Sequence, residues 1–197
     1  MKKKIRVIGL TGGLGSGKST VAAALRARRI PVVDADRIVR RALAPGGAAH
    51  ARVVRLFGPG GGGPGRPLDR KKIAAVIFSD PPLRRRLEGI LHPLVAREIR
   101  RAIARRPKLL VLDVPLLFES GLHRLADATA VVWAPWPLRY RRVVRSGRLT
   151  ASDARRREAV QMPLAEKKRR ADYVIDNRGT LQDLAREIGR FLEAIKK

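Results

Sequence analysis

The fold is decided by one stretch near the start of the chain, Ile5-Arg6-Val7-Ile8-Gly9-Leu10-Thr11-Gly12-Gly13-Leu14-Gly15-Ser16-Gly17-Lys18-Ser19-Thr20. Its first residues form a short apolar run rich in β-branched side chains, which predicts a buried parallel strand. The glycines that follow, together with Lys18 and Ser19, fit the phosphate-loop pattern G-x-x-x-x-G-K-S/T. Helix-forming residues resume after Thr20, so the pattern lies between a strand and a helix, as the motif requires.

The residue types in this loop suit phosphate binding. Glycine lets the backbone curl until successive N–H groups point at one anion, and the helix N-terminus adds its dipole. Lys18 supplies a mobile cation for the β- and γ-phosphates, and the Ser19 hydroxyl is a hard ligand suited to Mg²⁺. The alternative is a glycine-rich turn that only caps the helix. The predicted ATP-binding residues are Gly13, Leu14, Gly15, Ser16, Gly17, Lys18, Ser19 and Thr20.

Length and composition narrow the class of protein. At 197 residues the chain fits one domain with a substantial interior. It has no cysteine, which excludes disulfides and thiolate metal sites. No apolar stretch is long enough to span a bilayer, and the basic start of the chain lacks the features of a signal peptide. We therefore expect a cytoplasmic protein with no membrane partner, and the sequence specifies no oligomeric state.

The charge balance is extreme. Forty-four basic residues against 17 acidic ones give a formal net charge of +27, which predicts affinity for polyanions. The basic residues are spread through nearly every helical segment, however, and aromatic residues make up only 4% of the chain, which argues against a stacking platform for single strands. The sequence shows no zinc-finger spacing, basic-zipper heptad or aromatic RNA-recognition motif. We expect nucleic acid to bind non-specifically, if it binds.

Four further segments read as strands. They cover residues 30–36, 109–113, 128–133 and 171–177, and helical segments alternate with them. This order predicts a parallel α/β sheet with right-handed crossovers. The second and third strands end in carboxylates, at Asp34, Asp36 and Asp113. Because ligands of such sheets collect at the carboxyl ends of strands, these acids are expected near the phosphate loop.

The remaining segments are predicted to be helical or loop. A helical block between the second and third strands contains a glycine- and proline-rich surface loop at 58–67, and His92-Pro93 is expected to interrupt a helix. A cationic helical region from Pro137 to Arg170 is split at Ser146-Gly147. The last helix carries an apolar stripe of Leu181, Leu184, Ile188, Phe191 and Ile195.

Over nearly its full length the chain resembles the dephospho-CoA kinase family. The resemblance rests on separate motifs that follow one another in the family's order and at its spacing. They are the loop from Gly9 to Thr20, Asp34-Ala35-Asp36, Leu68-Asp69-Arg70, Leu91-His92-Pro93, Asp113-Val114-Pro115-Leu116-Leu117-Phe118-Glu119 and Ala171-Asp172-Tyr173-Val174-Ile175-Asp176-Asn177. At the start of the predicted lid, Trp136 and Arg139 stand where the family pattern has Glu and Gln.

The resemblance implies a fold like that of the P-loop NTPases, with a parallel five-stranded sheet flanked by helices in a single kinase domain. The nucleotide-binding core would cover about 1–35, 108–135 and 171–197, a helical CoA-side domain about 36–107, and a lid about 136–170. The implied reaction moves the γ-phosphoryl group of ATP to the ribose 3′-hydroxyl of dephospho-CoA, with Mg²⁺, as the last step of coenzyme A synthesis.

The acids at the strand ends have two interpretations each. The resemblance implies that Asp36 deprotonates the acceptor hydroxyl, whereas on spacing alone it fits a helix N-cap equally well. Asp34 is expected to be a neighbouring polar contact or a ligand of Mg²⁺-bound water. Asp113 either orders Mg²⁺-bound water or caps the loop before Pro115.

Arginines and a turn complete the predicted donor side. Arg142, Arg145 and Arg157 are selected by the resemblance as lid residues, because guanidinium forks match phosphate oxygens. Most other arginines in this region are expected to be solvated. Asn177 and Gly179 resemble the turn that contacts adenine.

For the acceptor pocket the resemblance selects Arg70, His92, Leu117 and Phe118. Arg70 would meet an acceptor phosphate, or else pair with a nearby carboxylate on the surface. His92 lies in an apolar-periodic segment, so a buried structural histidine is the alternative.

Two other functions fit part of this pattern. A nucleoside or nucleoside-monophosphate kinase shares the loop, the lid and the sheet, but the motifs at 91–93 and 113–119 favour the coenzyme A branch. A nucleic-acid-binding protein with a regulatory or vestigial phosphate loop would explain the charge.

Overall fold

The computed structural model describes residues 6–58, 62–63, 65–147 and 149–196, together with the backbone but not the side chains of Arg70, Lys71 and Phe78. The chain forms two compact units, Met1–Val33 with Ala102–Lys197, and Asp34–Arg101. Several residues of the predicted loop at 58–67 lie outside the described part of the chain. Among the described helices, none has the length and hydropathy needed to cross a membrane.

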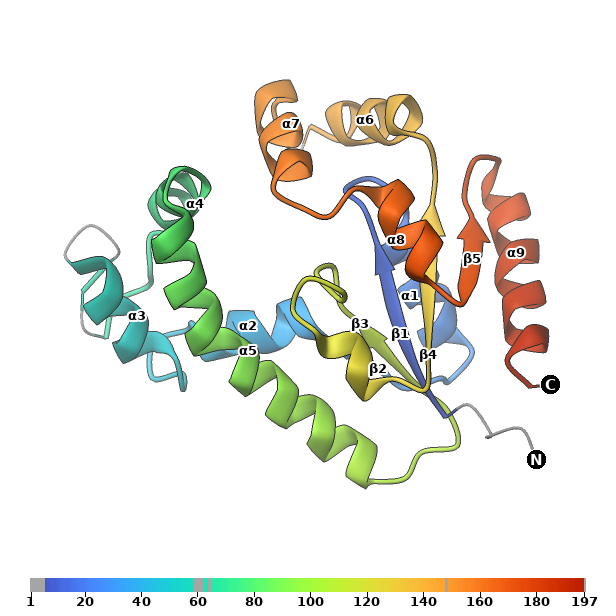
Figure 1. Ribbon diagram of the computed structural model, residues 1–197, viewed down its shortest axis with the longest axis horizontal. Coiled ribbons are helices and arrows are strands. Elements are labelled where there is room, and N and C mark those ends of the chain that lie inside the picture. Colours follow the sequence, from blue (N-terminus) through green and yellow to red (C-terminus); the bar gives the residue numbers. More distant parts are fainter. Residues whose placement is uncertain (1–5, 59–61, 64, 148, 197) are drawn as a thin grey trace. The chain divides into compact units, whose positions relative to one another are not determined.

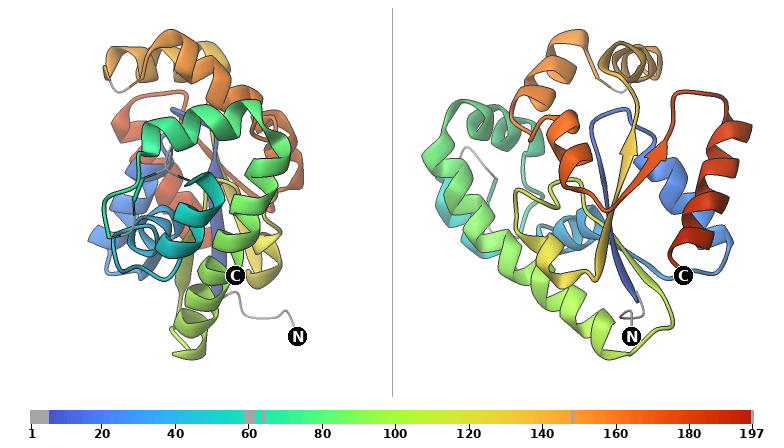
Figure 2. Two further views of the ribbon diagram at one scale, coloured as in Figure 1. Left: turned by 90° about the vertical axis from the view of Figure 1, so that its left-hand side faces the viewer. Right: turned by 45° about the vertical axis from the view of Figure 1, so that its right-hand side comes forward.

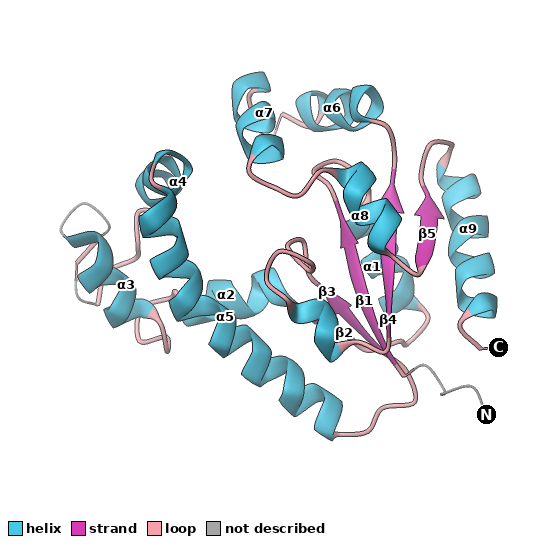
Figure 3. Ribbon diagram, in the orientation of Figure 1, coloured by secondary structure: helices cyan, strands magenta, loops and turns pink. Residues whose placement is uncertain are grey.

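Five parallel strands form one sheet in the order β2-β3-β1-β4-β5 (Figure 3). The central strand pairs with both neighbours, so that Leu10 lies opposite Asp113 of one and Ala130 of the other. The strands are β1 (Val7–Gly12), β2 (Val32–Asp34), β3 (Leu110–Asp113), β4 (Ala128–Trp133) and β5 (Tyr173–Asp176). The predicted parallel five-stranded sheet is confirmed.

The helices fall between the strands as the sequence pattern predicts. Those of the first unit are α1 (Lys18–Ala27), the 3₁₀ turn η2 (Leu122–Leu125), α6 (Trp136–Arg145), α7 (Ala151–Ala159), α8 (Leu164–Arg170) and α9 (Leu181–Ala194). Those of the second unit are α2 (Ala35–Ala42), α3 (His50–Phe57) and α4 (Arg70–Ser79), and α5 (Pro81–Ala104) begins there. The segment predicted as a lid supplies α6, α7 and α8.

Two helices cover one face of the sheet, and α8 lies over the other (Figures 1 and 2). On the face covered by α1 and α9, alternate side chains of β1, such as Ile8 and Leu10, pack against Leu25 of α1 and Ile188 of α9. All four of these side chains are at most 1% exposed. This core fixes the strand ends, and therefore the loops that carry the site.

The second unit has its own apolar core under α3, α4 and α5, which includes Val53, Ile73 and Leu87. His50 is buried beside it, with Nε2 2.7 Å from the carbonyl oxygen of Arg66. Burial of a histidine requires such a partner, because an unpaired ring nitrogen would lose its water without compensation. His50 is therefore a structural residue, and no local pattern around it predicts this role.

Side-chain caps set several helix starts. Asp69 accepts a hydrogen bond from the backbone N–H of Lys72 (3.0 Å), and Thr150 accepts one from that of Asp153 (3.1 Å). At α9, Thr180 and Asp183 form a reciprocal capping box. Hydrogen bonds from Thr180 and from Arg186 lower the pKa of Asp183 to about 2.

Two expectations about the helices are wrong. The helix α5 continues through Pro93, whereas an interruption was expected at His92-Pro93. A proline costs one hydrogen bond and strains one turn, and burial of Val95 and Ile99 beyond it holds the helix on that side. Leu181 is 76% exposed rather than part of the apolar stripe, because it is the first residue of α9.

The two leucines at the start of α9 give a matched test of the core. Leu184 is 2% exposed and Leu181 is 76% exposed. We expect Leu184→Ala to lower the free energy of unfolding by about 3 kcal/mol, because the truncation leaves a cavity. Leu181→Ala should change it by no more than about 0.5 kcal/mol. Urea unfolding followed by circular dichroism measures both, and equal losses would contradict the packing of α9.

Candidate active site

The phosphate loop joins β1 to α1. It turns back on itself through a hydrogen bond from the backbone N–H of Ser16 to the carbonyl oxygen of Gly13, at 3.1 Å. Gly15 and Gly17 have backbone φ angles of +73° and +92°, which residues other than glycine rarely adopt. A Cβ atom at Gly17 would also lie 2.1 Å from the amide nitrogen of Asn177. The glycines are therefore required by conformation and by close packing.

Lys18 and Asp113 form an ion pair at the mouth of this loop. Asp113 ends β3, and Lys18 begins α1 beside it in the first unit. Their side chains are 16% and 8% exposed. The carboxylate therefore holds the ammonium group at the carboxyl end of the sheet, and the expected meeting of strand-end acid and loop is found for Asp113.

Asn177 and Arg142 lie beside the same loop. The Asn177 side-chain amide donates to the carbonyl oxygen of Ser16 (2.7 Å), and the Arg142 guanidinium donates to the carbonyl oxygen of Asn177 (3.0 Å). Both residues line a pocket of about 360 Å³, a size typical of ligand sites. Its other lining residues are Gly17, Thr20, Gly179, Thr180, Leu181 and Leu184.

This pocket gathers the residues predicted for adenine and adds one that the sequence placed elsewhere. Leu181 is exposed and lines this pocket together with Arg142. The helical spacing of apolar residues predicts a place for Leu181 on the buried stripe of α9. Arg145 and Arg157 are exposed on α6 and α7. Arg142 therefore lies at the pocket with Asn177, and its predicted contact with phosphate stays a prediction, as do those of Arg145 and Arg157.

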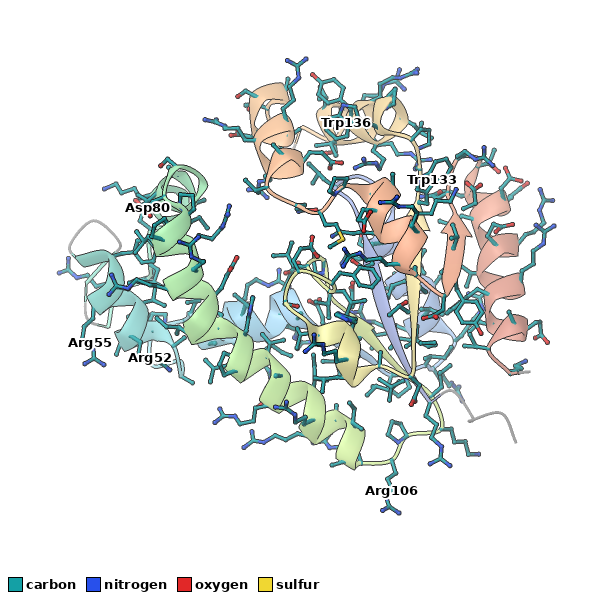
Figure 4. All side chains as sticks on the ribbon, in the orientation of Figure 1. Arg52, Arg55, Asp80, Arg106, Trp133 and Trp136 are labelled. Carbon is teal, nitrogen blue, oxygen red and sulfur yellow. The ribbon has the colours of Figure 1, made fainter. Side chains whose placement is uncertain are left out.

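Arg139 is the least expected residue of the site. Its guanidinium is almost fully buried and forms two hydrogen bonds with Glu158 of α7, at 2.9 and 2.6 Å. It also donates to the carbonyl oxygen of Leu14 in the phosphate loop, at 2.9 Å. Trp136, on the same helix, has its ring 5.0 Å from the guanidinium carbon, and Figure 4 shows it beyond the carboxyl ends of the strands.

A buried lysine connects α8 to the loop after β3. Lys167 is 0% exposed and pairs with Glu119 at 2.9 Å. Its ammonium also donates to the carbonyl oxygen of Pro115 (2.7 Å), which accepts a second hydrogen bond from the hydroxyl of Thr11. The sequence does not predict this burial, because nothing local marks Lys167 as different from Lys168 or Arg169.

The predicted acceptor residues fall in both units. In the first, Leu117 is fully buried and packs against Gly9, and Phe118 is 8% exposed. In the second, His92 is half-buried on α5, and the side chain of Arg70 lies outside the described residues. Their contacts with an acceptor stay predictions.

Asp34 and Asp36 take different places at the start of α2. Asp34 is the N-cap, because its carboxylate accepts a hydrogen bond from the backbone N–H of Arg37 at 2.9 Å. Asp36 lies in the first turn and is exposed. The interpretation of Asp36 as the N-cap is therefore wrong, and the capping role belongs to Asp34.

The second unit also contains a pocket of about 240 Å³ between α2 and α5. Arg41 and Arg97 face it together with Ile38 and Leu94. This mixture of cationic and apolar side chains was not identified from the sequence, because the two helices lie far apart along the chain.

A parallel sheet with a phosphate loop after β1, a lysine held by a strand-end acid and arginines beside the loop defines a phosphate-loop kinase. A family model described as dephospho-CoA kinase matches residues 6–183. A dephospho-CoA kinase of Anaeromyxobacter dehalogenans is 46% identical over 196 residues, which cover 98% of this chain and 93% of that one. One of Geobacillus kaustophilus is 42% identical over 92% of each chain. This chain belongs to the dephospho-CoA kinase family.

Solved structures share the fold. A crystal structure of a Thermus thermophilus protein has a TM-score of 0.84, with 39% identity over 99% of this chain and 100% of that one. A dephospho-CoA kinase from Campylobacter jejuni has a TM-score of 0.69, with 22% identity over 96% of each chain. A shikimate kinase from Bacteroides thetaiotaomicron has a TM-score of 0.53, with 15% identity over 98% of this chain and 99% of that one. The similarities to the Campylobacter jejuni and Bacteroides thetaiotaomicron structures show the fold alone.

Lys167 and its neighbour provide a test of the buried pair. We expect Lys167→Met to lower the free energy of unfolding by about 3 kcal/mol, because it leaves Glu119 without its buried partner. Lys168→Met removes an exposed cation whose ammonium lies 4.2 Å from the Trp133 ring centre, and should cost about 1 kcal/mol or less. Urea unfolding measures the difference. If both variants lost the same free energy of unfolding, the buried Lys167–Glu119 pair would contribute no more to stability than an exposed cation.

Proposed function

We propose that the chain transfers the γ-phosphoryl group of ATP to the ribose 3′-hydroxyl of dephospho-CoA, which gives CoA and ADP in the last step of coenzyme A synthesis. Membership of the dephospho-CoA kinase family identifies an ATP-dependent phosphotransferase that acts on dephospho-CoA. The observation that carries the donor side is the phosphate loop with the Lys18–Asp113 pair at its mouth. A cytoplasmic location, where ATP is abundant, is part of the proposal.

The phosphate loop and Lys18 form the donor half. Backbone N–H groups of residues 13–20 surround the phosphates, and the helix dipole of α1 adds positive potential there. Lys18 moves from Asp113 to the β- and γ-phosphates as ATP binds, since an ammonium group on a flexible stem needs only rotation to change partners. The pocket at Arg142, Asn177 and Leu181 receives the adenine.

Arg145 and Arg157 supply the remaining charge on the lid. Phosphoryl transfer passes through a loose transition state, so positioning and charge neutralisation carry most of the rate. Both guanidinium groups are exposed, on α6 and α7, so binding phosphate oxygens would break no buried contact.

Asp36 is the proposed general base of the acceptor half. Its carboxylate accepts the proton of the 3′-hydroxyl as the new O–P bond forms and the bond to the ADP oxygen breaks. Two observations support the choice: Asp36 is exposed, and Asp34 rather than Asp36 caps α2. His92, Arg70, Leu117 and Phe118 remain its proposed companions around the acceptor.

The donor set at the loop fits Mg²⁺. The ion prefers a hydroxyl or one or two carboxylates together with water and substrate phosphates, so a dedicated cage is unnecessary. Ser19 and Asp113 offer such oxygens, and the described residues contain no cluster of three or more acidic or histidine ligands. When bound, the ion would neutralise charge on the phosphates, and Ser19 and Asp113 would hold it there.

A panel of acceptors tests this function against the alternatives. With ATP as donor, we expect phosphorylation of dephospho-CoA and no comparable activity on nucleosides or nucleoside monophosphates, measured by ADP release. Activity on a nucleoside monophosphate alone would contradict the assignment. Salt-sensitive binding of duplex DNA at physiological ionic strength without kinase activity would favour the nucleic-acid alternative.

Asp36→Asn tests the base, with Asp34→Asn as a matched control. We expect the first substitution to lower kcat at least about a hundredfold with little change in the KM values, because the amide cannot accept the proton. Asparagine is a good N-cap, so the second should leave α2 intact and kcat within about threefold. Circular dichroism checks the fold. Near-normal turnover in Asp36→Asn would remove Asp36 from this role.

A further inference from the structure

We infer that Arg139 is a positioning residue for nucleotide phosphates: it holds the phosphate loop from behind, so that a loop N–H group faces the anion. The inference starts from the hydrogen bond between the Arg139 guanidinium and the carbonyl oxygen of Leu14, at 2.9 Å. The resemblance implies that Arg139 stands at a position where the family has Gln. The resemblance assigns it neither a catalytic nor an ATP-binding role.

The planar peptide bond transmits this contact to the anion side. In a trans peptide the C=O of one residue and the N–H of the next point in opposite directions. A donor that fixes the Leu14 carbonyl therefore fixes the Gly15 N–H on the other side of the loop. In a phosphate loop that side is the cradle in which N–H groups meet the α- and β-phosphates. Arg139 sets a donor direction without touching the phosphate.

A second carbonyl of the loop is held in the same way. The Asn177 side chain donates to the carbonyl oxygen of Ser16, which fixes the N–H of Gly17 by the same geometry. Gly15 and Gly17 are also the two loop residues with positive φ. The carbonyl groups of Leu14 and Ser16 are thus held by Arg139 of α6 and by Asn177, the residue after β5.

The loop and α6 are packed too closely to move independently. A Cβ atom at Gly15 would lie 2.5 Å from the carbonyl oxygen of Arg139, and one at Gly13 would lie 2.7 Å from its guanidinium nitrogen. Real Cβ atoms essentially never approach other atoms so closely. Glycine at these positions lets Arg139 reach Leu14, so the loop sequence and the arginine depend on each other.

Glu158 keeps the guanidinium in this place. Both carboxylate oxygens accept from Arg139, and its Nε donates to the carbonyl oxygen of Ala134 at 3.0 Å. The Arg139 side chain is 4% exposed, and removing such a charge from its partners is costly. Arg139 therefore stays behind the loop, unlike exposed Arg145 and Arg157. Because Glu158 belongs to α7, the pair also connects α7, through Arg139 of α6, to the loop.

Arg139→Met removes the donors while keeping most of the side-chain volume. We expect ADP to bind at least about tenfold more weakly, because the Leu14–Gly15 peptide loses its anchor. Isothermal titration calorimetry with ADP alone measures this, and no acceptor is needed. In the kinase assay the KM for ATP should rise by a similar factor, while the KM for dephospho-CoA changes less than about twofold. Arg141→Met, an exposed site on the same helix, is the matched control.

The double variant Arg139→Met with Glu158→Gln separates positioning from stability. It leaves no unpaired carboxylate, so we expect its melting temperature to recover most of what Arg139→Met loses. ADP affinity should stay low, because neither substitution restores a donor to Leu14. Affinity that recovers with the melting temperature would overturn the inference, as would wild-type ADP affinity in either folded variant. Since ADP binding requires no acceptor, failure here is distinct from failure of the proposed role of Asp36.

Discussion

Two hydrogen bonds to the outer side of the phosphate loop underlie the whole donor site. Arg139 and Asn177 donate to the carbonyl oxygens of Leu14 and Ser16, across 125 and 161 residues of sequence. A glycine-rich loop has more backbone freedom than any other segment, and ordering it when the nucleotide arrives would cost binding free energy. Because the hydrogen bonds from Arg139 and Asn177 already order the loop in the folded protein, nucleotide binding does not have to order it. The orientation of the N–H groups and the closeness of α6 follow from these contacts, and the Arg139–Glu158 pair links α7 to them.

The large positive charge is handled in two ways. A few cations are buried against specific acids, as in the pairs Arg139–Glu158 and Lys167–Glu119. Arg139 also donates to the phosphate loop, and the Lys167–Glu119 pair connects α8 to the loop after β3. Other cations form exposed pairs within one helix, such as Arg101 with Glu98 and Arg190 with Glu187. Exposed pairs contribute little to stability. The excess of cations therefore acts mainly through the field around the protein, which attracts anionic substrates.

Local patterns were enough to predict the sheet, the phosphate loop and the family. Each depends on residues close together in the sequence, so spacing carries the information. The burial of Arg139 and Lys167 and the contact of Asn177 with Ser16 depend on long-range packing. In the sequence, a buried arginine of a helix with several arginines looks the same as its solvated neighbours. Leu181 was placed in the core for a similar reason, because periodicity does not show where the N-terminal end of a helix leaves the sheet.

The central claim is that side chains behind the loop orient it before the nucleotide binds. Crystal structures of the protein with and without ADP test this most directly. We expect the Leu14–Gly15 and Ser16–Gly17 peptides to have the same orientation in both, with Arg139 and Asn177 within about 3 Å of the two carbonyl oxygens. A loop whose peptides turn over on ADP binding, with Arg139 released from Leu14, would contradict the account.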